Sequence, residues 1–86
     1  MNASQNYGHA LIVDKHGDEL ARYIVGAEDP ANPEGYADRF ARNAGYDIEP
    51  SKPGAIIPDG CEDLRIEVWT ERGTLWASRN YMIVPE

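Results

Sequence analysis

The 86 residues provide for one domain, and their 42% hydrophobic and 27% charged side chains are typical of a globular chain rather than a disordered one. Fifteen acidic side chains against eight basic ones give a net charge of −7. This charge disfavours direct binding to nucleic acid or to an anionic membrane and favours a basic partner, unless it serves only to keep the protein soluble.

The N-terminal part predicts a flexible lead followed by a β-hairpin. Residues 1–6 are polar, so we expect a flexible N-terminal lead rather than a signal peptide. Two runs rich in apolar and β-branched residues, 7–13 and 20–25, are separated by a polar turn over 14–18. A helix over 18–25 is the alternative, but the segment is short and ends directly at a glycine.

The best-marked element is a helix that follows this hairpin. Asn32 is a favourable N-cap, and Pro33 suits the first helical position because the N–H that proline lacks has no partner there. Gly45 is a typical residue just past a helix end. Between them, the apolar and small residues repeat with helical spacing and form one face: Tyr36, Ala37, Phe40, Ala41 and Ala44.

The next segment, residues 46–63, contains three prolines and two glycines and is predicted to be a long loop. Within it, the apolar residues 55–57 are expected either to anchor the loop in the core or to form a brief edge strand. A loop of this length in a small domain is often functional.

The C-terminal part predicts a second hairpin. Residues 64–70 alternate strictly, with Leu64, Ile66 and Val68 on one face, and residues 75–84 form the returning strand. With a two-residue turn at Arg72 and Gly73, Trp69 would lie opposite Trp76.

The elements together predict one α+β domain. We expect a small antiparallel sheet in the order β-β-α-β-β with one helix packed on a face. Residues 7–86 would form a single compact domain that carries the long loop at 46–63. No stretch approaches the roughly 18 apolar residues that a membrane-spanning helix needs, and a domain of this size with one cysteine is expected in a reducing, cytoplasmic environment.

Residues suited to catalysis are few, and we expect a protein that is not an enzyme. His9 and His16 have no serine or cysteine beside them that could form a nucleophile–base pair. Cys61 is flanked by Asp59 and Glu62, which differs from the electropositive surroundings of reactive cysteines.

No cofactor signature is present either. The glycines form neither a dinucleotide-binding nor a phosphate-binding motif. Asp14, His16, Asp18 and Glu19 lie close together around one turn, but they do not match the spacing of a calcium loop. A solvated turn is the simpler interpretation, so no metal site is expected.

The remaining features point to a protein partner. If Leu64, Ile66 and Val68 face the helix, Trp69 and Trp76 face outwards, where aromatic side chains commonly anchor interfaces. The alternative is that the two tryptophans form the core. Acidic residues gather at the helix start and in the long loop, where several carboxylates on one surface could imitate nucleic-acid phosphates; the candidate partner-binding acids are Glu28, Asp29, Glu34, Asp38, Asp59, Glu62 and Asp63.

This profile, a short, acidic domain without a catalytic set, is similar in type to small inhibitors from phages and other mobile elements, such as anti-CRISPR and anti-restriction proteins. The similarity implies a protein that blocks a basic, nucleic-acid-binding surface of a larger complex. An accessory subunit, antitoxin or immunity protein with one cognate partner is a second possibility, and a small enzyme or metal-binding protein is a third. We expect a monomer or a homodimer, because exposed strand edges invite pairing.

Overall fold

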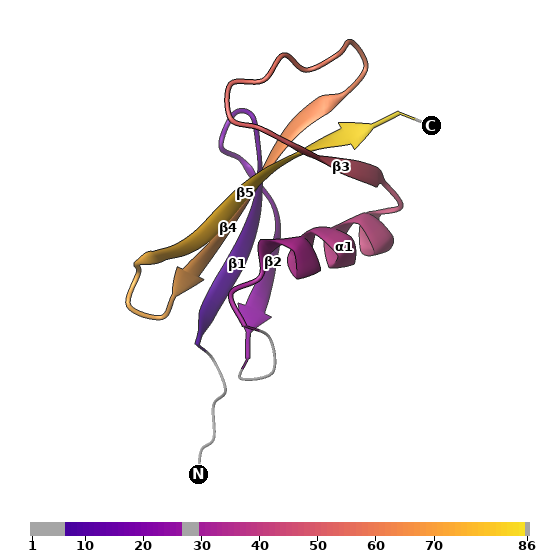
Figure 1. The fold of residues 1–86 in the computed structure, drawn as a ribbon. Coiled ribbons are helices and arrows are strands. Elements are labelled where there is room, and N and C mark those ends of the chain that lie inside the picture. Colours follow the sequence, from indigo (N-terminus) through magenta and orange to yellow (C-terminus); the bar gives the residue numbers. More distant parts are fainter. Residues whose placement is uncertain (1–6, 27–29, 86) are drawn as a thin grey trace.

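The computed structural model describes residues 7–26 and 30–85, which form one helix and a five-stranded antiparallel sheet (Figure 1). The protein is therefore an α+β protein. The elements are β1 (Gly8–Asp14), β2 (Glu19–Val25), α1 (Pro33–Ala44), β3 (Asp47–Ser51), β4 (Glu62–Thr70) and β5 (Leu75–Val84). Their order across the sheet is β2-β1-β4-β5-β3.

The predicted element order is wrong by one strand, because β3 lies inside the segment expected to be a loop. Its five residues pair with the end of β5 and include Pro50. Proline lacks a backbone N–H and is tolerated in edge strands such as this one. The residues between β3 and β4 carry no strand, and Ile56 in their middle is 95% exposed, so it does not anchor the loop in the core. The predicted flexible lead, 1–6, lies outside the described residues.

The first hairpin is confirmed, and its turn is closed by an aspartate. Asp14 Oδ1 accepts hydrogen bonds from the backbone N–H groups of His16 (2.8 Å) and Asp18 (3.0 Å). Aspartate favours turns because its side chain can bond the backbone a few residues on. β1 and β2 then pair antiparallel, with an irregularity after Ile12.

Helix α1 begins at Pro33 and ends at Ala44, as the sequence predicts. Asn32 precedes it, but its side chain makes no capping hydrogen bond. At the other end, Gly45 adopts a left-handed conformation (φ 76°), and its N–H donates to the Ala41 carbonyl at 2.9 Å. The C-terminal end of α1 is therefore capped by a hydrogen bond, whereas the N-terminal end has no side-chain cap.

The core lies between α1 and one face of the sheet. Leu64, Ile66 and Val68 on the central strand β4 are at most 1% exposed. The helix contributes Tyr36, Ala37 and Phe40 to the same cluster, and the other strands add Ala10, Ile12, Val25 and Tyr81. Trp69 and Trp76 are absent from this cluster, so the alternative that the tryptophans form the core is wrong.

The second hairpin is present but irregular. Val68 lies opposite Ala77 as predicted, but the register shifts after Val68, and Trp69 lies opposite Leu75. The predicted Trp69–Trp76 pair is therefore wrong, because a β-bulge places an additional residue in β5 at this point.

Candidate functional site

The sheet face turned away from α1 is a candidate binding surface, and we call it the open face. On β4 its residues are Arg65, Glu67 and Trp69, which alternate with the three buried residues of the core. The register places further side chains on the same face: His9 and Leu11 of β1, Ile24 of β2, and Asn80 and Met82 of β5. Since α1 covers the opposite face, the helix leaves this surface free.

A chain of polar contacts runs along the centre of the open face. Arg65 Nε donates to Glu67 Oε2 at 2.8 Å, and Trp69 Nε1 donates to Glu67 Oε1 at 3.2 Å. Each oxygen of the Glu67 carboxylate thus accepts one hydrogen bond, Oε2 from Arg65 and Oε1 from Trp69. The Trp69 indole is thus held in one orientation by a group that is itself held by Arg65.

Apolar side chains surround Trp69 at one end of this face. Trp69 lies opposite both Leu75 and His9, and His9 lies opposite Ile24. Ile24 is 65% exposed, and Leu75 and Trp76 keep nearly half of their surface exposed. We call Ile24, Trp69 and Leu75 the apolar patch; Tyr7 and Trp76 are also exposed near this end of the sheet.

Carboxylates occupy the opposite end of the open face. Met82 of β5 lies between Glu49 on β3 and Asp63 on β4, and opposite residues of neighbouring strands share a face. Asp47 lies opposite Val84, one row further along the same face. We call Asp47, Glu49 and Asp63 the acidic end. Asp63 and Trp69 are six residues apart on one strand, a distance of about 20 Å at the usual rise per residue.

The acids predicted from the sequence as one surface are divided between several. Asp63 shares the open face with Trp69, whereas Glu62 lies opposite Ile83 on the side of α1. Asp59 is exposed in the loop before β4. Glu34 and Asp38 lie exposed on α1, where Glu34 contacts Arg79 at 3.6 Å, and Glu28 and Asp29 lie outside the described residues.

Some residues of the open face were missed from the sequence. Alternation along β4 already places Arg65 and Glu67 on the side of Trp69, so this signal was available. The contributions of Ile24 and Leu75 depend on strand register and on the bulge, which no local pattern indicates.

Two of the carboxylates around the first turn, those of Asp14 and Glu19, accept hydrogen bonds within the protein. Backbone N–H donation, first from Asp18 and then from His16, lowers the pKa of Asp14. Glu19 Oε1 accepts from Arg22 at 2.8 Å, and this bond lowers the pKa of Glu19. Over residues 7–26 and 30–85, no group of three or more histidines, cysteines or carboxylates is placed to hold a metal ion.

The other groups considered for catalysis are separated from one another. Cys61 is half-buried in the loop before β4, and its backbone N–H donates to the Pro58 carbonyl. His9 lies at the opposite end of the sheet, next to Trp69, and His16 is exposed in the first turn.

Comparisons with known proteins found no match: no family model, no curated protein and no solved structure matches this chain. In the described part of the chain, no helix has the length and apolar character needed to cross a membrane. Function is therefore argued from the surface of this protein itself.

Proposed function

We propose that this protein is a small, non-enzymatic, cytoplasmic binding protein that docks its open face on a basic surface of a larger protein or complex. The observation that carries the proposal is the arrangement of this face, with an exposed apolar patch at one end and carboxylates at the other.

The apolar patch has the chemistry of an interface centre. Tryptophan contributes strongly to protein interfaces, and an anchor held in place before binding loses less conformational freedom on association. Glu67 supplies that restraint for Trp69. Ile24 and Leu75 extend the apolar surface on either side of the anchor.

The acidic end indicates that the preferred partner surface is positively charged. Among the described residues, Asp47, Glu49 and Asp63 form no ion pair, so their charges are left for a partner. The whole chain carries a charge of −7, which attracts a basic surface from a distance. About 20 Å separates the two ends of the open face, which a protein interface of standard size spans.

The specific form of the proposal is an inhibitor of the type made by phages and mobile elements. Carboxylates in a row can take the place of phosphates on a nucleic-acid-binding surface, and the apolar patch would hold the protein there. A nucleic-acid-binding partner would support this form, whereas a toxin or an enzyme subunit would favour an antitoxin, immunity or accessory role.

The test is affinity capture with matched variants. The protein is immobilised as wild type, Trp69→Ala, Asp63→Lys or Asp38→Lys, and exposed to a lysate of the cells in which it acts. The two lysine variants make the same charge change, one on the open face and one on α1. Circular dichroism establishes that each variant is folded.

We expect at least one protein whose recovery falls about tenfold or more with Trp69→Ala and falls with Asp63→Lys but not with Asp38→Lys. Recovery that is equal for the two lysine variants and unaffected by Trp69→Ala would refute docking through the open face.

A further inference from the structure

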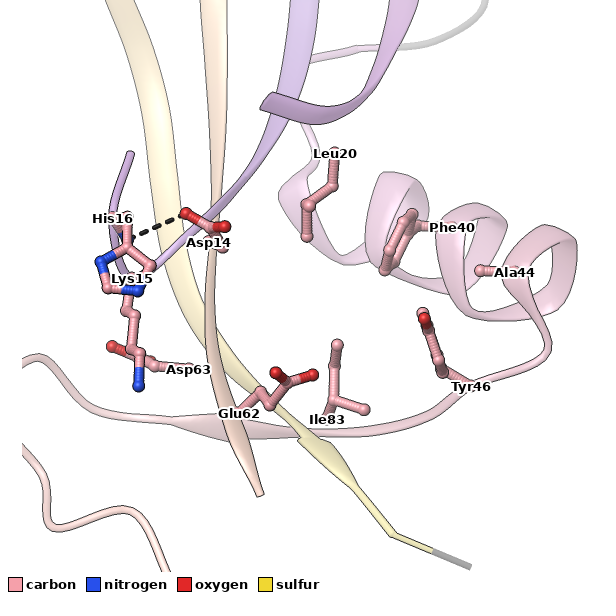
Figure 2. A pocket seen from close by; sticks show the side chains of 10 residues that line it. All are labelled: Asp14, Lys15, His16, Leu20, Phe40, Ala44, Tyr46, Glu62, Asp63 and Ile83. Carbon is pink, nitrogen blue, oxygen red and sulfur yellow. Dashed lines mark hydrogen bonds between the residues drawn. The ribbon is translucent and has the colours of Figure 1, made fainter. Parts of the chain in front are cut away.

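A hollow of about 350 Å³ lies on the other side of the sheet, at the C-terminal end of α1. Its apolar wall includes Leu20, Phe40 and Ile83, which come from β2, α1 and β5 (Figure 2). The volume falls at the lower end of the range found for small-molecule sites.

The wall of this hollow leaves apolar surface in contact with solvent. Leu20 and Tyr46 remain 45% and 46% exposed, although both line it. The Tyr46 ring packs on Phe40 with the ring centroids 5.8 Å apart, so the two rings form one aromatic wall. A compact apolar group placed here would remove this surface from water, which is favourable.

One carboxylate stands at this wall without a partner. Glu62 lies opposite Ile83, and Figure 2 shows its carboxylate beside that side chain, with Leu20 and Phe40 across the hollow. The carboxylate of Glu62 makes no hydrogen bond or ion pair with any described residue. A cation bound at this point would gain a counter-charge without displacing an existing one.

The other charges around the hollow also favour a cationic ligand. Asp14 and Asp63 also line it, against the ammonium group of Lys15. In addition, α1 ends at Ala44, also part of the lining, and the C-terminal end of a helix carries a partial negative charge. The carboxylates and the helix end would disfavour an anionic ligand, and together they outweigh the one lysine.

We propose that this hollow is a binding site for a compact organic ammonium ligand, of the size and chemistry of an arylalkylamine. The apolar body lies against Leu20, Phe40 and Ile83, and the ammonium group pairs with Glu62. Apart from Asp63, which belongs to the acidic end and also lines the hollow, this site lies on the other side of the sheet from the open face, and its existence does not depend on the proposed partner.

The test is an NMR titration of the ¹⁵N-labelled protein with three probes that share one ring. These are 2-phenylethylamine, the uncharged 2-phenylethanol and the anionic phenylacetate. We expect saturable shifts with the amine at concentrations up to about 10 mM, centred on the amides of Leu20, Ala44 and Glu62. The alcohol should bind more weakly, and phenylacetate should produce no saturable shift.

Two variants and a control locate the site. Ala44→Leu fills the hollow from an exposed helical position that accepts leucine, and should weaken amine binding at least about tenfold. Glu62→Gln should weaken it about two- to fivefold, because exposed ion pairs contribute little. Glu49→Gln, a matched change on the open face, should leave it unchanged. Equal binding of the amine and the alcohol, shifts spread over the whole surface, or an Ala44→Leu protein that binds as wild type would overturn the proposal.

Discussion

Among the described glycines, Gly8 is the one with the least room for a side chain. Its φ is 146°, and a Cβ built there would lie 1.8 Å from the Trp69 carbonyl oxygen on β4. Gly17 also has a positive φ, 83°, but nothing lies within 4 Å of its Cβ position. The two glycines thus separate the effect of backbone conformation from that of close approach, since only Gly8 combines both.

The two glycine-to-alanine variants should therefore differ in stability. Gly17→Ala is expected to lose about 1–2 kcal/mol through conformational strain alone. Gly8→Ala should lose about 1–3 kcal/mol more, because β1 must move away from the central strand. Urea denaturation of both variants measures the difference, and equal losses would show that β1 and β4 do not approach as closely as described.

Asp14 should make the first turn sensitive to acid. Its pKa is lowered in the folded state, chiefly by the Asp18 N–H, so the ionised carboxylate favours folding. The stability it contributes is fully present above its ordinary value of 3.8 and is lost as the pH falls through the lower, folded pKa.

The stability difference between wild type and Asp14→Ala should consequently be constant near neutral pH and shrink as the pH falls below 3.8 through the lower, folded pKa. Denaturation curves at several pH values measure it. Asp18→Ala is the control, since the turn uses the backbone N–H and carbonyl of that residue and not its side chain. A difference that does not change with pH would show that the ionised carboxylate is not what holds the turn.

The two ends of α1 differ in how well they are capped. The sequence predicts a loss of about 1 kcal/mol for Asn32→Ala, because asparagine usually caps a helix through its side chain. The structure shows no such hydrogen bond, so we expect a loss of less than about 0.5 kcal/mol. Gly45→Ala should cost about 1 kcal/mol, because Gly45 is left-handed. Thermal melts test this order, and a larger loss at Asn32 would reverse it.

The elements that the sequence predicted well have strong local signals. Alternation identified β4, helical spacing identified α1, and the polar turn identified the first hairpin. Strand β3 was missed because Pro50 argues against a strand, and only pairing with the end of β5 makes its five residues regular. The bulge opposite Trp69 was missed for the same reason, since it exists only in the register of two strands.

The candidate site was predictable from the sequence only where alternation along a single strand determines it. The outward orientation of Trp69 follows from alternation with buried neighbours. The grouping of acids does not, because neighbours such as Glu62 and Asp63 lie on opposite faces of one strand. Proximity in sequence therefore overstated how many carboxylates share a surface.

For the molecule as a whole, charge and apolar surface occupy opposite ends of one face. Carboxylates at the acidic end act over a distance and should govern how fast a basic partner is met. The apolar patch acts only on contact and should govern how long the complex lasts. The two ends are thus expected to control different rate constants.

The most direct measurement is the association rate with a captured partner, by surface plasmon resonance at low and high salt. We expect association to slow as salt rises and to slow further with Asp63→Lys but not with Asp38→Lys, because exposed charges are screened beyond about 8 Å at physiological ionic strength. Trp69→Ala should instead accelerate dissociation. An association rate that is indifferent to salt and to Asp63→Lys would contradict electrostatic docking through the open face.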